Sequence, residues 1–105
     1  MAEFDAGPSE GFPEASPVRV DADGSEIAVV RLGSRIYAVA DCCSHAKASL
    51  AEGEVIAEEA SIECPRHGAT FDLETGEALT LPATASVGTY RATERDGRVY
   101  LQAMS

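Results

Sequence analysis

Two short pairs of metal-binding side chains constrain this chain more than any other feature of its sequence. The first pair has the spacing Cys-x-His. The second pair has the spacing Cys-x-x-His, and eighteen residues separate it from the first. The four residues are Cys43, His45, Cys64 and His67. They include both histidines of the chain and two of its three cysteines. A fold that brings the pairs together can hold one small metal centre with two thiolates and two imidazoles.

The rest of the sequence predicts short strands joined by tight turns. Asp-Gly and Gly-Ser dipeptides, which tolerate the positive φ of two-residue hairpin turns, separate runs that are rich in Val, Ile, Tyr and Thr. The expected strands are 18–20, 27–30, 35–39, 89–93 and 98–101. Only residues 46–51 have a helical composition, and they suffice for no more than a turn or two. We therefore expect an all-β domain of small antiparallel sheets.

Each ligand pair directly follows a strand-like segment, 37–40 for the first and 61–63 for the second. We therefore expect the pairs on adjacent loops at one end of the scaffold, where functional sites are commonly built. A chain of 105 residues makes one domain. Residues 1–15, with their glycines, prolines and acids, are expected to be a loosely ordered segment ahead of the domain at 16–105. Gly53 and Gly76 are expected to be ordinary turn glycines.

The composition limits the classes of partner. Eighteen acidic residues against eight basic ones give a net charge of −10, which disfavours nucleic acid and anionic membranes and suits docking on basic surfaces. No apolar stretch approaches the ~20 residues of a membrane helix, and the N-terminus does not resemble a secretory signal. Three cysteines, two of them in ligand spacing, argue against a disulfide scaffold. These features predict a cytoplasmic protein.

Three kinds of site compete for the two pairs. A structural Cys2His2 zinc site accepts these four ligands, but such sites usually group Cys with Cys and His with His. One Cys and one His on each loop favour a two-iron cluster, in which two thiolates hold one iron and two imidazoles hold the other. A nucleophilic Cys-His pair leaves the doubled pattern unexplained. The spacing places the iron–sulfur interpretation ahead of zinc and leaves both open.

Residues 43–53 and 62–72 resemble the two cluster loops of Rieske [2Fe–2S] proteins, and the similarity continues through 73–78 and 81–83. It is greatest with the small ferredoxins of bacterial ring-hydroxylating dioxygenase systems. The resemblance implies a Rieske-like fold with one [2Fe–2S] cluster per chain. It implies that Cys43 and Cys64 bind the inner iron, that His45 and His67 bind the outer iron, and that Leu81 and Pro82 cover the cluster.

The same resemblance implies a function in electron transport. The chain would carry single electrons from an NAD(P)H-dependent flavoprotein ferredoxin reductase to the Rieske oxygenase terminal component, without being an enzyme by itself. Two alternatives within the family are the small subunit of an assimilatory nitrite reductase and a ferredoxin linked to iron–sulfur assembly. An alternative from another class is a zinc-stabilised interaction module.

The resemblance also bears on the redox potential. High-potential members of the family donate hydroxyl hydrogen bonds to the cluster sulfurs from a Ser and a Tyr, whereas the matching positions here are Ala69 and Phe71. Those members also carry a loop disulfide, and its positions here are Ala48 and Arg66. These differences imply a potential near the bottom of the Rieske range, about −150 mV. Cys42, one position out of register with the motif, is expected to be a free thiol.

Overall fold

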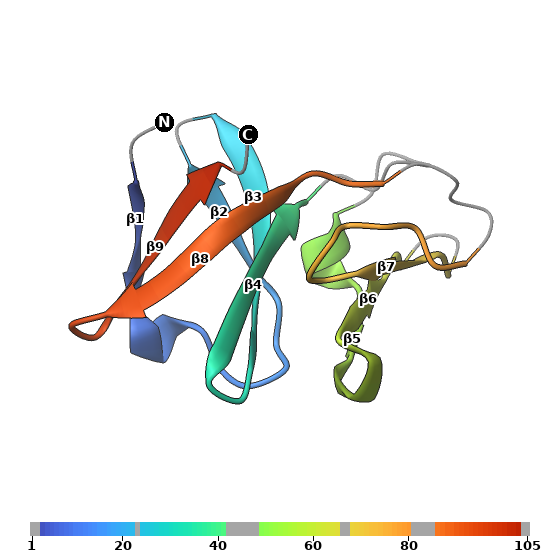
Figure 1. Ribbon diagram of the computed structural model, residues 1–105, viewed down its shortest axis with the longest axis horizontal. Helices are drawn as coiled ribbons and strands as arrows, with labels where there is room; N and C mark the ends of the chain where they lie inside the picture. Colours follow the sequence, from blue (N-terminus) through green and yellow to red (C-terminus); the bar gives the residue numbers. More distant parts are fainter. Residues whose placement is uncertain (1–2, 23, 42–48, 66–67, 81–85, 104–105) are drawn as a thin grey trace.

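The computed structural model describes residues 3–22, 24–41, 49–65, 68–80 and 86–103, and within them the strands form two antiparallel sheets (Figure 1). The larger sheet has the strand order β1-β9-β8-β4-β3-β2. Its strands are β1 (Phe4–Pro8), β2 (Val18–Ala22), β3 (Ser25–Leu32), β4 (Arg35–Ala40), β8 (Thr89–Arg95) and β9 (Arg98–Ala103). The smaller sheet has the order β5-β6-β7. Its strands are β5 (Glu54–Ile56), β6 (Ser61–Glu63) and β7 (Thr70–Asp72).

The predicted hairpins form as their turn residues indicate. Strands β3 and β4 pair up to Leu32 opposite Arg35, which leaves Gly33-Ser34 as a two-residue turn. Strands β8 and β9 pair up to Arg95 opposite Arg98, and the two turn residues between them have φ values of 53° and 76°. Positive φ at both positions is the geometry for which Asp-Gly is favoured. The prediction of an all-β fold of small antiparallel sheets is confirmed.

Helical structure in the described residues is limited to three short 3-10 turns. They are η1 (Ser9–Gly11), η2 (Leu50–Glu52) and η3 (Ala57–Glu59). The helical composition noted at 46–51 therefore yields a single turn where the chain is described. None of these turns has the length or the apolar character that a membrane-spanning helix needs.

The N-terminal segment differs from its prediction. Residues 4–8 are strand β1 at the edge of the larger sheet, where Phe4 lies opposite Leu101 of β9. Phe12, a few residues later, is only 4% exposed and belongs to the core. The expectation of a loosely ordered segment over 1–15 is wrong for the described residues. Local composition could not reveal β1, because its partner strand lies at the opposite end of the chain.

One of two buried apolar clusters joins the sheets and contains Cys64. It takes Val30 from β3, Val39 from β4, and Ile62 and Phe71 from the smaller sheet. We call it the inter-sheet cluster, and its buried members are Ala28, Val30, Val39, Leu50, Ile62, Cys64, Ala69, Phe71, Leu73 and Val87. The other cluster lies within the larger sheet and includes Ile27, Val29 and Val99. The inter-sheet cluster therefore fixes how the smaller sheet sits on the larger one.

Two glycines allow backbone segments to approach closely near this cluster. A Cβ atom on Gly53 would lie 1.8 Å from the carbonyl oxygen of Glu63, and one on Gly76 would lie 2.1 Å from the carbonyl oxygen of Val87. Gly76 also has a φ of +78°, which side-chain-bearing residues rarely adopt. The expectation that these are ordinary turn glycines is wrong, because each position is closed to a side chain by another part of the backbone.

Candidate metal centre

One of the four predicted ligands, Cys64, lies within the described residues. It directly follows β6, is 0% exposed, and packs within the inter-sheet cluster. Cys43, His45 and His67 lie outside the described residues, as do the predicted covering residues 81–83. The geometry of the site is therefore built from Cys64 and from the described residues that flank the other segments.

Backbone hydrogen bonds hold Cys64 at the base of the β6–β7 connection. Its N–H donates to the carbonyl oxygen of Ala69 at 2.7 Å, and its own carbonyl accepts from the N–H of Gly68 at 3.0 Å. These bonds continue the pairing of β6 with β7 by one step and close the connection between them. The cysteine consequently occupies a fixed position at the end of a short hairpin, next to the segment that carries His67.

The described residues that flank the first ligand segment, 42–48, are hydrogen-bonded to each other. Strand β4 ends at Ala40, and the N–H of Leu50 donates to the carbonyl oxygen of Asp41 at 2.7 Å. Leu50 is fully buried in the same cluster as Cys64. Ala40 and Leu50, which flank the first ligand segment, therefore pack in or against the same buried cluster as Cys64.

The described residues on either side of 81–85 are held in a similar way. Thr80 precedes this segment, and the Thr80 hydroxyl accepts from the N–H of Thr70 at 2.9 Å and lies 3.0 Å from the Thr70 hydroxyl. Val87 follows it, donates its N–H to the carbonyl of Gly76 at 2.8 Å, and is buried in the inter-sheet cluster. Motif reading did not single out Asp41, Thr70 or Thr80, since their role depends on partners about ten residues away in the chain.

The surroundings of Cys64 are apolar where the resemblance predicted them to be. Ala69 and Phe71, both 0% exposed, belong to the same cluster and carry no hydroxyl. A buried cysteine that extends a hairpin, with apolar neighbours that exclude water, is suited to bind the inner iron of a two-iron cluster. Elsewhere in the described part of the chain, His, Cys, Asp and Glu do not gather into any group of three that could hold a metal ion.

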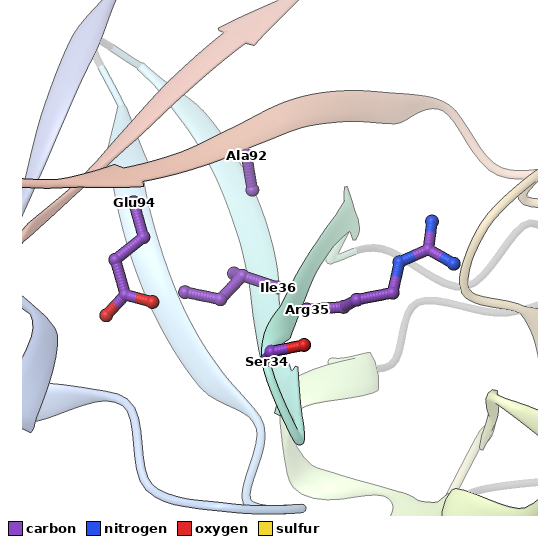
Figure 2. Close-up of a pocket in the computed structure, with 5 residues that line it drawn as sticks. All are labelled: Ser34, Arg35, Ile36, Ala92 and Glu94. Atoms are coloured by element: carbon purple, nitrogen blue, oxygen red, sulfur yellow. The ribbon is translucent and has the colours of Figure 1, made fainter.

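A pocket at the other end of β4 has different chemistry. Ser34, Arg35, Ile36, Ala92 and Glu94 line it, and Figure 2 shows the Arg35 and Glu94 side chains pointing away from each other. Arg35 lies 3.4 Å from the carboxylate of Glu74, and Glu94 lies 2.7 Å from Arg31. Its lining contains neither thiol nor imidazole, and its two charged residues already have partners. This pocket does not resemble a metal site.

Comparison with known proteins assigns the family. The model of the Rieske [2Fe–2S] domain matches residues 2–91. The chain is 40% identical over 94 residues to the "3-phenylpropionate/cinnamic acid dioxygenase ferredoxin subunit" of Shigella flexneri serotype 5b (strain 8401), a match that covers 90% of this chain and 87% of that protein.

Solved structures agree with this assignment. The ferredoxin of carbazole 1,9a-dioxygenase from Nocardioides aromaticivorans IC177 superposes with a TM-score of 0.94 at 32% identity, covering 99% of this chain and 100% of that one. A ferredoxin in complex with the oxygenase of carbazole 1,9a-dioxygenase superposes with a TM-score of 0.87 at 32% identity, covering 95% of this chain and 92% of the matched chain. This chain belongs to the Rieske [2Fe–2S] domain family, and its cofactor is a Rieske [2Fe–2S] cluster. The resemblance seen in the two loop motifs is confirmed, and the zinc and nucleophile interpretations are set aside.

Proposed function

We propose that this protein is the ferredoxin component of a multicomponent dioxygenase system. It carries single electrons in the cytoplasm, from an NAD(P)H-dependent flavoprotein reductase to a Rieske non-haem iron oxygenase. The observation that carries the proposal is a 40% identity to a dioxygenase ferredoxin subunit that extends over 90% of this chain. A similar structure is a complex of reduced oxygenase and oxidized ferredoxin in carbazole 1,9a-dioxygenase, which supports an oxygenase as the electron acceptor.

The ligands we propose are Cys43 and Cys64 for the inner iron and His45 and His67 for the outer iron. Bound in this way, a Rieske cluster accepts and releases one electron. The two thiolates supply more negative charge than the two neutral imidazoles, and this donor set gives a higher potential than four thiolates would. The buried hairpin position of Cys64 supports its assignment to the inner iron, because the surrounding apolar residues keep water from that side.

The proposed electron donor is a separate flavoprotein. The sequence contains no glycine-rich dinucleotide-binding motif of the G-x-G-x-x-G type, so nothing in it suggests that it oxidises NAD(P)H directly. A one-electron carrier without a nicotinamide site needs a partner that divides the two electrons of a hydride, which is the chemistry of a flavin. We therefore regard the protein as a carrier within an oxidoreductase system and not as an enzyme in its own right.

The first experiment tests the ligands. Protein produced with ample iron should be reddish-brown and should give a rhombic electron spin resonance signal after one-electron reduction. Cys64→Ala and His45→Ala should abolish that signal, whereas Cys42→Ser should retain it because Cys42 lies outside the ligand set. A colourless wild-type protein that contains only zinc would refute the assignment, and so would a Cys64→Ala variant with an unchanged signal.

The second experiment tests the partners. Stopped-flow mixing of the reduced protein with a dioxygenase terminal component should show electron transfer, and a flavoprotein ferredoxin reductase with NADH should restore the reduced form. A protein that instead supported only the catalytic subunit of an assimilatory nitrite reductase, or only iron–sulfur assembly, would contradict the proposal and select that alternative.

A further inference from the structure

The carboxylate of Asp41 is buried beside the first ligand segment, and the ligand motifs do not account for it. Asp41 is the first residue after β4 and is 2% exposed. Among the residues that the structure describes, it is the only charged residue that is buried. Burying a carboxylate costs free energy unless hydrogen bonds and an opposite charge compensate for it. The contacts that compensate here indicate what the residue does.

Two hydrogen bonds converge on one carboxylate oxygen of Asp41. The Ser49 hydroxyl donates to Oδ1 at 2.9 Å, and the backbone N–H of Ala51 donates to the same atom at 2.9 Å. Between these two residues, the N–H of Leu50 donates to the Asp41 backbone carbonyl at 2.7 Å. Asp41, which precedes segment 42–48, is thereby hydrogen-bonded to the three successive residues 49–51 that follow the segment.

Asp41 is itself fixed to the larger sheet. Its N–H donates to the carbonyl of Glu26, at the start of β3, at 3.0 Å. Nη1 of Arg19, on β2, lies 3.8 Å from Oδ2, which is the carboxylate oxygen without a bond to residues 49–51. Arg19 also lies 3.7 Å from Glu26, so the guanidinium is shared between two carboxylates. Residues 49–51 are therefore tied through Asp41 to β2 and β3.

We propose that Asp41 is a positioning residue for the [2Fe–2S] cluster. By its hydrogen bonds to residues 49–51, it ties together the described residues on either side of 42–48, the part of the sequence that contains Cys43 and His45. Fixing both ends of a short loop reduces the conformations it can adopt, so the ligands are presented in a narrower range of geometries. The inference rests on the proposed ligand assignment. It assigns to Asp41 an effect on the cluster that acts through its hydrogen bonds to residues 49–51.

Three variants of the iron-loaded protein test the proposal. Asp41→Ala removes the shared acceptor, Ser49→Ala removes one donor, and Asp41→Asn keeps a side-chain oxygen that can accept both bonds. In Asp41→Ala, we expect the Ala51 amide to exchange with solvent at least about tenfold faster than in the wild type, because partly buried donors lose their acceptor. Iron should pass to a chelator faster by a similar factor. The g values of the reduced protein should also shift. Ser49→Ala should change the amide exchange, the iron release and the g values in the same direction, but by less. In Asp41→Asn, all three quantities should stay close to their wild-type values.

A control separates this role from general stability. Val99→Ala removes buried apolar volume from the larger-sheet cluster. It should lower the unfolding temperature without altering the g values or the exchange of the Ala51 amide. The proposal is overturned if Asp41→Ala matches Val99→Ala in these readouts, or if Asp41→Asn behaves like Asp41→Ala. If Asp41→Ala does not fold, Ser49→Ala and Asp41→Asn decide. A wild-type protein without a cluster would overturn the proposed function as well, whereas a normal wild-type cluster with unaffected variants would overturn this inference alone.

Discussion

Ala69 and Phe71 make the neighbourhood of Cys64 apolar, and neither has a hydroxyl to donate to a sulfur atom. Both are fully buried in the cluster that contains Cys64. Hydrogen bonds to the sulfurs of an iron–sulfur cluster stabilise its reduced form and raise its potential. The absence of a hydroxyl at these two positions therefore favours a potential at the low end of the family range.

We predict a midpoint potential of about −150 mV for the wild type and a more positive value for Ala69→Ser. The added hydroxyl would stand next to the backbone of Cys64, because Ala69 is the residue whose carbonyl accepts the Cys64 N–H. Ala38→Ser serves as the control, since Ala38 is equally buried but belongs to the other cluster. Redox titration followed by circular dichroism measures the potentials. A clearly positive wild-type value would contradict this account.

Glu94 is the carboxylate whose acidity the fold changes most clearly among the described residues. Arg31 donates two hydrogen bonds to it, at 3.2 and 2.7 Å, and these lower the pKa of Glu94 from 4.5 to about 2. A carboxylate with a lowered pKa stabilises the folded state at pH values above its unfolded pKa, and this contribution is lost as the pH falls toward the folded pKa. Arg31 also donates to the carbonyl of Phe12, so the pair links β8 to the N-terminal segment.

Glu94→Gln should therefore destabilise the protein at neutral pH and should matter less in acid. The difference in urea midpoint between wild type and variant should be constant above pH 4.5 and should shrink as the pH falls from 4.5 toward 2. Glu58→Gln is the matched control, because Glu58 is an exposed carboxylate on the turn η3. A difference that stayed constant down to pH 2 would show that the Arg31 contact does not depend on the Glu94 charge.

At the level of elements, the smaller sheet depends on the close approach at Gly53. This glycine ends η2 and leads into β5, and the carbonyl of Glu63 at the end of β6 occupies the space that a side chain would need. Because Cys64 follows Glu63 directly, a displacement at this point would move the base of the second ligand loop.

We expect Gly53→Ala to lower the free energy of unfolding by about 1–3 kcal/mol, the usual cost of forcing an extra carbon into a packed site. Gly11→Ala is the control, since a Cβ atom there meets nothing within 4 Å and its φ is not in the left-handed region. Urea denaturation compares the two variants. Equal stabilities would mean that β5 and β6 separate at little cost.

Strand β1 is an element that the local sequence pattern did not predict. Its sequence contains Gly7 and Pro8, which predict loop structure, and a bulge between Asp5 and Gly7 interrupts its pairing with β9. The pairing is reinforced by ion pairs between Glu3 and Arg95 at 2.6 Å and between Asp5 and Arg98 at 2.9 Å. Both ion pairs join residues more than ninety positions apart, so only the folded chain brings them together.

For the whole molecule, the dominant electrostatic property is its net charge of −10. The basic residues of the described chain are largely committed to ion pairs with acidic neighbours, as Arg31, Arg95 and Arg98 are. The excess charge is therefore negative over the surface and attracts a partner that presents basic residues.

We predict that electron transfer to the oxygenase slows by about tenfold or more when the ionic strength rises from ~0.01 M to ~0.5 M. Salt screens the attraction between the proteins, so the association step should carry the effect. Reduction of the same protein by a neutral small-molecule mediator is the control and should change little. A salt-independent rate with the oxygenase would show that the negative charge serves solubility alone.

Local signals in the sequence were enough to predict the cofactor chemistry of this protein and most of its strands. Paired Cys and His residues at short spacing, and turn dipeptides between β-branched runs, are local signals, and they predicted a Rieske cluster protein of hairpins. Contacts between residues that are not neighbours in sequence were seen only in the folded chain. They include the pairing of β1 with β9, the close approach of Gly53 to Glu63, and the hydrogen bonds between Asp41 and residues 49–51. Those depend on which segments meet after folding, since burial and backbone approach are properties of the packed chain that no short window of sequence contains.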